Sequence, residues 1–161
     1  MEKLRIVFMG TPDFAVGILD SILKNNYEVV GVITAADKPA GRGQKISESA
    51  VKKTALALKI PILQPPNLKA PDFIETMSNY QADLGVVIAF RMLPEVVWQM
   101  PPLGTFNLHG SLLPQYRGAA PINWAIINGE KETGVTTFFL QHKIDTGDVI
   151  EQEKVLIGEN E

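Results

Sequence analysis

An amide and an imidazole two residues apart, Asn107 and His109, lie at the end of a short apolar stretch. Residues i and i+2 of a strand point to the same face, so an extended backbone would set a neutral hydrogen-bond donor beside a titratable ring. The hydroxyl of Ser111 and the guanidinium of Arg117 follow within the same segment. This density of reactive groups predicts a functional site rather than a piece of core.

Asp145 is the third residue of interest, in the run Ile144-Asp145-Thr146-Gly147-Asp148. Each residue alone has a structural explanation: Asp145 as a turn former, His109 as a satisfied core histidine, Asn107 as a cap at a strand end. Together, an amide donor, a ring and a carboxylate are the groups that can carry an acyl carbon through a tetrahedral state without a covalent enzyme intermediate. We therefore expect the three to form one site.

The elements that must position these residues alternate between strand and helix. Near-continuous apolar runs predict strands that are buried on both faces. Thr11 is expected to cap the first helix, with Pro12 in its first turn and Asn25-Asn26 at its end. The expected strands are Leu4–Met9, Val29–Ile33, Ile62–Leu63, Leu84–Ala89, Phe106–Leu108, Val135–Leu140 and Val149–Leu156, and the later helices are Ser49–Leu58, Pro71–Asn79, Pro94–Gln99 and Pro121–Asn128.

This order predicts the α/β class, with an open, mostly parallel, Rossmann-like sheet and helices on both faces. Sites in such sheets lie outside the carboxyl ends of the strands. The Gly10 turn, the Arg91 loop and the segment Asn107–Pro114 would all lie there.

Composition limits the classes of function. The 161 residues, 45% hydrophobic and 20% charged, fit one globular domain. A net charge of −3 restricts any nucleic-acid contact to a local basic patch. The chain has no cysteine and two histidines, which excludes disulfides and thiolate nucleophiles and predicts no metal. Leu4–Met9 is too short to span a membrane, so a cytoplasmic enzyme or binding domain, with no membrane partner, is the simplest interpretation.

Two loops are candidates for ligand binding. The Gly10 turn lacks the later glycines of a dinucleotide fingerprint, since Pro12 and Ala15 stand there, which argues against a nicotinamide or flavin. The long loop 35–47 carries Lys38, Arg42 and Lys45 on a flexible tether, a composition suited to phosphate. From its residues alone, a solvated loop with incidental charge is the favoured explanation.

Several motifs then point to a family. They are Gly10-Thr11-Pro12-Asp13-Phe14, Pro39-Ala40-Gly41-Arg42-Gly43, Asn107-Leu108-His109-Gly110-Ser111-Leu112-Leu113-Pro114, Arg117-Gly118-Ala119-Ala120-Pro121, Glu132-Thr133-Gly134-Val135-Thr136 and Asp145-Thr146-Gly147-Asp148. Over the full length, the chain resembles the methionyl-tRNA formyltransferases. The Asn-x-His and Ser-Leu-Leu-Pro pair is the signature of the wider 10-formyltetrahydrofolate transferase superfamily, and Pro39–Gly43 resembles the tRNA-reading insertion of the methionyl-tRNA enzymes.

The resemblance implies an enzyme of translation initiation. It would transfer the formyl group of 10-formyltetrahydrofolate, its co-substrate, to the α-amino group of methionine on initiator tRNA, without a metal or a redox cofactor. Asn107 and a protonated His109 would donate to the developing oxyanion. Asp145 would favour the charged ring and assist proton transfer.

The resemblance also implies binding residues and a domain plan. The folate would lie near Arg91, Met92 and Leu93, over a floor of Ser111, Leu112, Leu113 and Pro114. Phe14, equally explained as core, would receive the methionine side chain, and Lys38, Arg42 and Lys45 would contact tRNA. Residues 1–161 would be a truncated catalytic domain, without the C-terminal β-rich domain that grips tRNA. The alternatives are a formyltransferase for a sugar-nucleotide amine or glycinamide ribonucleotide, and a folate-binding domain without turnover.

Overall fold

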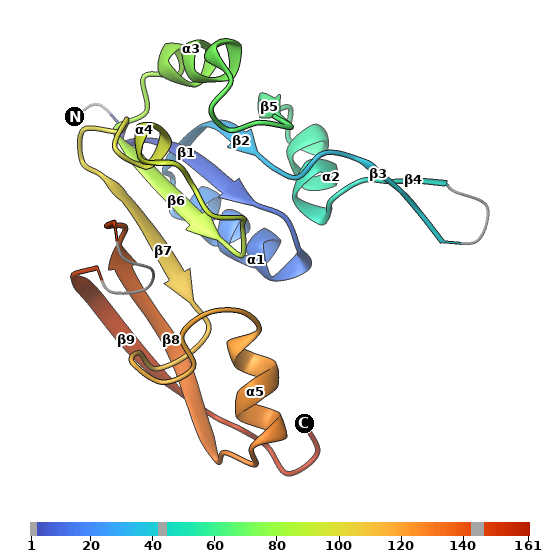
Figure 1. The fold of residues 1–161 in the computed structure, drawn as a ribbon, viewed down its shortest axis with the longest axis vertical. Helices are drawn as coiled ribbons and strands as arrows, with labels where there is room; N and C mark the ends of the chain where they lie inside the picture. Colours follow the sequence, from blue (N-terminus) through green and yellow to red (C-terminus); the bar gives the residue numbers. More distant parts are fainter. Residues whose placement is uncertain (1–2, 42–44, 143–146) are drawn as a thin grey trace. The chain divides into compact units, whose positions relative to one another are not determined.

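The computed structural model describes residues 3–41, 45–142 and 147–161. They form two compact units, Met1–Thr105 and Phe106–Glu161, which are described in turn (Figure 1).

The first unit is built on four parallel strands. These are β1 (Arg5–Gly10), β2 (Glu28–Ile33), β5 (Ile62–Leu63) and β6 (Leu84–Ile88), in the order β5-β2-β1-β6. In β1 and β6 every residue after the first is buried, as expected for strands covered on both faces. The carboxyl ends of β1 and β6 lie at the same edge of this sheet (Figure 1).

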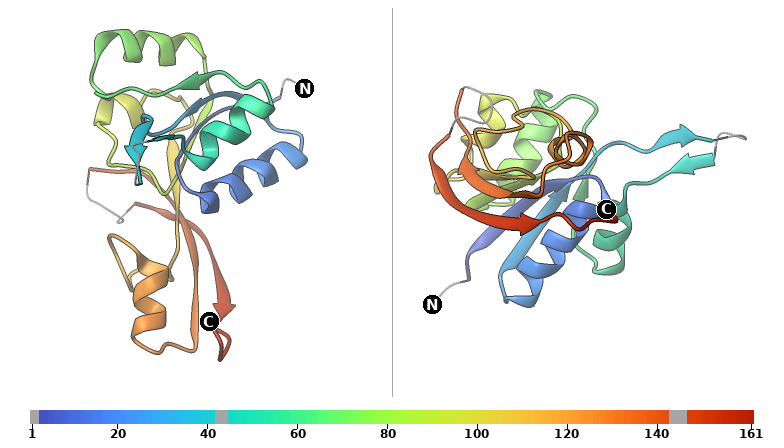
Figure 2. Two further views of the ribbon diagram at one scale, coloured as in Figure 1. Left: turned by 90° about the vertical axis from the view of Figure 1, so that its right-hand side faces the viewer. Right: turned by 90° about the horizontal axis from the view of Figure 1, so that it is seen from below.

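Helices cover both faces of these strands. They are α1 (Asp13–Lys24), α2 (Ala50–Ala57), α3 (Pro71–Asn79) and α4 (Glu95–Trp98). α1 and α2 pack on one face, while α3 and α4 lie on the other (Figure 2). The α/β class with an open, mostly parallel sheet is confirmed, and α3 matches its expected bounds residue for residue.

The start of α1 differs from the expectation by one residue. Pro12 is extended, with φ −81° and ψ 175°, so it is the N-cap and Asp13 is the first helical residue. The placement of Pro12 inside the first turn, with Thr11 as the cap, was therefore wrong. The end was predicted correctly: Asn25 caps the helix and Asn26 follows with a φ of 63°.

The loop after β2 contains structure that the sequence did not predict. Strands β3 (Lys38–Ala40) and β4 (Lys45–Ser47) pair antiparallel as a separate two-stranded sheet. This β3–β4 hairpin extends away from the α/β layers of the first unit (Figures 1 and 2). From the sequence, a long loop without strands is expected at this position.

The second unit contains antiparallel strands and one helix. β7 (Thr105–His109), β8 (Glu132–Phe139) and β9 (Val149–Leu156) pair in sequence order, and α5 (Pro121–Ile127) packs against β8. Along β8 the buried residues alternate as Gly134, Thr136 and Phe138, the period of a strand with one face inside. β9 matches its expected bounds, and all its residues are exposed.

Candidate active site

Strand β7 carries the amide and the imidazole. Asn107 pairs with Phe138 of β8, and His109 pairs with Thr136. The two side chains therefore share a face of the strand, as the spacing predicted. Asn107 is partly exposed, whereas His109 is 7% exposed.

The ring of His109 is oriented by a backbone carbonyl. Its Nε2 lies 2.8 Å from the carbonyl oxygen of Tyr116. Because a carbonyl oxygen can only accept, Nε2 is the donor in this contact and carries a hydrogen. The hydrogen bond at Nε2 therefore fixes the orientation of the His109 ring.

Tyr116 has an unusual backbone conformation and a side chain with two hydrogen-bond partners. Its φ of 54° lies in the left-handed region, which is uncommon for a residue other than glycine. The phenol donates to Glu130 Oε1 at 2.6 Å and accepts from Asn128 Nδ2 at 3.1 Å. The carboxylate of Glu130 as acceptor raises the pKa of Tyr116 above its ordinary value, so the phenol keeps its proton at neutral pH.

The expected folate floor, Ser111 to Pro114, is tied to the neighbouring strands. Thr136 Oγ1, fully buried, donates to Ser111 O at 2.7 Å and accepts from Leu113 N at 3.1 Å. Gln152 Nε2 donates to Thr136 Oγ1 and to Leu113 O, each at 2.9 Å. One threonine hydroxyl therefore links the segment to β8 and β9.

Two close approaches complete this arrangement. The hydroxyl of the buried Ser111 donates to Gln115 O at 2.6 Å. A Cβ at Gly134 would lie 2.2 Å from the backbone oxygen of Glu153 and 2.6 Å from Leu112 Cδ2, so glycine at this position lets β8 lie this close to β9 and to Leu112. Pro114, the last residue of the floor, is exposed.

In the first unit, the loop after β6 is fixed through Arg91. The guanidinium donates to Pro66 O at 3.1 Å and to Pro65 O, and lies 5.7 Å from the centre of the Phe90 ring. These contacts join the loop after β6 to the loop after β5. The side chain of Arg91 is therefore bound within the protein. Of the next two residues, Met92 is 74% exposed and Leu93 is 9% exposed.

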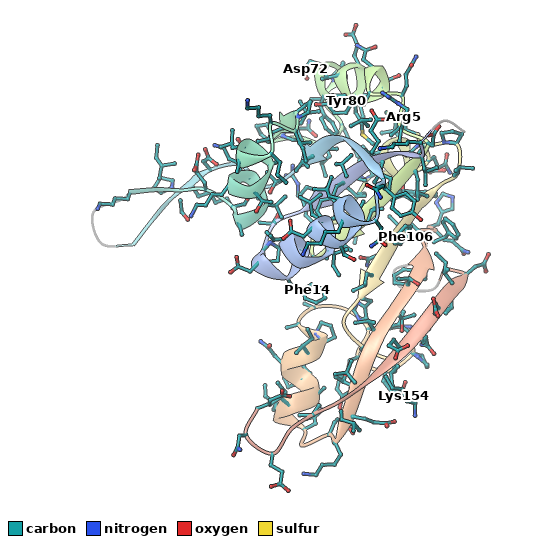
Figure 3. The ribbon with its side chains drawn as sticks, turned by 180° about the vertical axis from the view of Figure 1, so that it is seen from behind. Arg5, Phe14, Asp72, Tyr80, Phe106 and Lys154 are labelled. Carbon is teal, nitrogen blue, oxygen red and sulfur yellow. The ribbon has the colours of Figure 1, made fainter. Side chains whose placement is uncertain are left out.

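Phe14 is 40% exposed on α1, which excludes the explanation that it is core (Figure 3).

A cavity of about 570 Å³ opens between the turn after β1 and the start of α2. Ser49 accepts a hydrogen bond from Lys52 N as the N-cap of α2. The lining residues are Thr11, Pro12, Asp13, Val16, Glu48, Ser49, Ala50, Lys53 and Thr54.

The expected tRNA contacts Lys38 and Lys45 lie on strands β3 and β4, and both are exposed. Arg42 and Asp145 lie outside the described residues, so their roles stay predictions. Thr136, Gln152 and Tyr116 were missed, because nothing near them in the sequence indicates contacts with residues 7 to 39 positions away.

The described residues contain neither a candidate metal-binding cluster nor a candidate membrane-spanning helix. No group of three or more histidine, cysteine, aspartate or glutamate side chains there could hold a metal ion, and the absence of a metal stays a prediction. No helix in the described parts of the chain is long and apolar enough to cross a membrane.

Comparisons with known proteins agree with one another. Residues 4–161 match the family described as formyl transferase. A methionyl-tRNA formyltransferase of Flavobacterium johnsoniae is 69% identical over 98% of this chain and 50% of its own length. One of Bacteroides fragilis is 63% identical over 99% of this chain and 49% of its own length. The chain thus spans about half the length of the curated relatives it matches.

A solved structure shares the fold. The phosphoribosylglycinamide formyltransferase of Bacillus halodurans superposes with a TM-score of 0.78 at 24% identity, covering 98% of this chain and 82% of its own.

Proposed function

Since the chain belongs to the formyl transferase family, we propose that it transfers the formyl group of 10-formyltetrahydrofolate to the α-amino group of methionine on initiator methionyl-tRNA. The observation that carries this proposal is the identity of 69% and 63%, over nearly the whole chain, to proteins named methionyl-tRNA formyltransferase. The reaction belongs to the initiation of protein synthesis in the cytoplasm.

The proposed reaction is a direct transfer. The amine nitrogen attacks the formyl carbon, and the carbonyl oxygen takes up negative charge. The bond from that carbon to the folate nitrogen then breaks, as a proton passes from the amine to the departing nitrogen. No covalent intermediate on the enzyme is needed.

Asn107 and His109 are the proposed catalytic residues. The amide of Asn107 and the Nδ1–H of the protonated His109 donate to the oxyanion, while the Nε2–H of His109 keeps its contact with Tyr116. Asp145 favours the charged ring and helps to move the proton. Support for His109 comes from its fixed Nε2 contact, since a general acid acts best when its ring is oriented.

The folate is proposed to contact two segments. The backbone of Arg91, Met92 and Leu93 pairs with the pterin ring, a role that suits a loop whose arginine side chain is committed to Pro65 and Pro66. Ser111, Leu112, Leu113 and Pro114 form the floor near the transfer point. No metal takes part.

The tRNA substrate is proposed to contact the first unit. Phe14, with 40% of its surface exposed, receives the methionine side chain. Lys38, Arg42 and Lys45 of the hairpin region contact phosphates.

A second candidate is the formylation of glycinamide ribonucleotide. A phosphoribosylglycinamide formyltransferase has the same fold, with a TM-score of 0.78, but at 24% identity this likeness concerns the fold alone and does not favour that substrate. A sugar-nucleotide amine as acceptor, or folate binding without turnover, has no comparable support.

A competition assay tests the proposal. The protein is given 10-formyltetrahydrofolate with equal concentrations of charged initiator tRNA, glycinamide ribonucleotide and a sugar-nucleotide amine, before and after dialysis against a chelator. We expect formyl-methionine on the tRNA at a rate that the chelator does not change. Exclusive turnover of a small amine, or folate binding with no turnover, would reject the proposal.

A further inference from the structure

The described side chains of the β3–β4 hairpin, those of Lys38, Pro39 and Lys45–Ser47, are all exposed. Every residue of β4 is exposed, and Ile46, the large apolar residue of that strand, is 72% exposed. In the part of the hairpin that the structure describes, three residue pairs form the ladder, and none of them pairs with the larger sheet. An isolated two-stranded hairpin is only marginally stable in water, so the position of this one must be set by contacts at its base.

One lysine joins the two ends of the hairpin. Asp37 directly precedes β3, and Glu48 directly follows β4. Lys52 Nζ of α2 lies 2.5 Å from Asp37 Oδ2 and 2.9 Å from Glu48 Oε1. The ammonium group therefore bridges the carboxylates that flank the hairpin.

The lysine itself is held in place by the start of α2. Its backbone N–H donates to Ser49 Oγ at 3.0 Å, and Ser49 Oγ lies 2.6 Å from Thr34 Oγ1 at the end of β2. Gln64 Nε2 donates to Asp37 Oδ1 at 2.8 Å and to Ala35 O at 2.9 Å. The base is thus connected to α2 and to the segments that follow β2 and β5.

The side chain of Lys52 is 15% exposed, compared with 70% for Lys154, which forms a 2.9 Å ion pair with Glu132 across β8 and β9 (Figure 3). Ion pairs as exposed as that of Lys154 contribute little, whereas partly buried groups in a network are screened less by solvent. Without Lys52, the carboxylates of Asp37 and Glu48 would repel each other and any nearby phosphate.

We propose that Lys52 is a positioning residue that holds the β3–β4 hairpin in the orientation in which its lysines meet the phosphates of the tRNA substrate. This inference rests on the proposed function, because it assigns the hairpin to that substrate. Lys52 touches neither the substrate nor the reacting atoms. Its effect is transmitted through Asp37 and Glu48.

Hydrogen exchange followed by mass spectrometry tests the positioning without any substrate. Lys52→Met keeps the length of the side chain and removes its charge, and Lys154→Met is the matched control. We expect peptides covering 38–41 and 45–47 to exchange about tenfold faster in Lys52→Met, with β8 and β9 unchanged. Unchanged exchange in the hairpin would overturn the proposal.

Steady-state kinetics test the consequence for the substrate. In Lys52→Met, KM for charged initiator tRNA should rise about tenfold, while kcat and KM for 10-formyltetrahydrofolate stay within about twofold of wild type. Lys154→Met should match wild type in all three. A KM for tRNA that does not change, in a variant whose hairpin exchanges faster, would also overturn the proposal.

Lys52→Arg separates positioning from general damage. Arginine can bridge the same carboxylates, so it should restore hairpin protection and the KM for tRNA to within about threefold of wild type. A Lys52→Arg variant that folds, by far-UV circular dichroism, yet behaves like Lys52→Met would contradict the bridge. If the wild-type protein does not formylate tRNA, the proposed function fails, while hydrogen exchange still decides whether Lys52 positions the hairpin.

Discussion

The segment from Asn107 to Pro114 and the β3–β4 hairpin are held in opposite ways. In the first, His109 and Ser111 are 7% and 0% exposed, and hydrogen bonds from β8, β9 and the Tyr116 backbone fix the segment along its length. In the second, Lys38, Pro39 and every residue of β4 are exposed, and the contacts that fix the hairpin lie at its base, around Lys52. The segment from Asn107 to Pro114 is therefore supported along its length, and the hairpin mainly at its base.

This difference fits the two tasks of the proposed function. Bond formation requires reacting groups held within fractions of an ångström, which needs a buried and fully bonded support. Contact with a large polyanion requires accessible charge, which an extended hairpin provides at the cost of its own packing. If this division is correct, changes in the first segment lower kcat, and changes in the hairpin raise KM for tRNA.

The largest effect is expected at the proposed catalytic residues. Asn107→Ala and His109→Ala should each lower kcat by about 100-fold or more, because each removes a donor to the oxyanion, and far-UV circular dichroism should stay unchanged. His142→Ala, at the exposed second histidine, is the control and should keep wild-type kinetics. Rates within a few-fold of wild type for both test variants would remove them from the chemistry.

The support beneath the floor should matter next. Thr136→Val leaves Ser111 O and Leu113 N without their partner, which should lower the free energy of unfolding by about 2 kcal/mol. Thr137→Val on the same strand is the matched control, because Thr137 is only partly buried, and it should cost less than about 0.5 kcal/mol. Equal costs in urea denaturation would show that the Thr136 hydroxyl is not the link.

A smaller effect is expected at a single phosphate contact. Lys45→Ala should raise KM for tRNA about threefold to tenfold and reduce the salt dependence of that KM, without changing the affinity for folate. Arg42→Ala, outside the described residues, should act in the same direction. An unchanged salt dependence in both variants would argue that the hairpin does not contact phosphates.

The smallest effect concerns the carboxyl of Asp37. The hydrogen bond from Lys52, and then that from Gln64, lowers the pKa of Asp37 below its ordinary value of 3.8. A lowered pKa means that this carboxyl stabilises the fold above pH 3.8 and loses that contribution as the pH falls through the folded-state pKa. Lys52→Met should raise the pKa measured by ¹³C NMR, and Gln64→Leu should raise it less. The same pKa in both variants would mean that Lys52 is not the main partner.

The sequence predicted the α/β layers well because their signals are local. The buried runs of β1 and β6 and the proline that starts α3 act within a few residues. The β3–β4 hairpin was missed because its strands lack apolar alternation, with Pro39 in one and exposed Lys45 and Ser47 in the other. Pro12 was misplaced by one residue because a proline at the N-cap and a proline at the first helical position have similar φ angles and differ in the backbone ψ angle.

The site was predictable in its residue types but not in its support. A spacing of two indicated that Asn107 and His109 share a face, and the structure bears this out. The carbonyl of Tyr116 contacts His109, and the backbone of Tyr116 is left-handed. This conformation is uncommon for a residue other than glycine, so the sequence does not predict it. Thr136 contacts Ser111 across 25 positions, a pairing that depends on the strand register.

The most direct test of this division is to measure kcat and KM for charged initiator tRNA in His109→Ala and Lys52→Met side by side. The account predicts a fall in kcat of about 100-fold with a near-constant KM for His109→Ala, and a rise in KM of about tenfold with a near-constant kcat for Lys52→Met. If both variants change the same parameter, the two segments do not divide reaction from recognition.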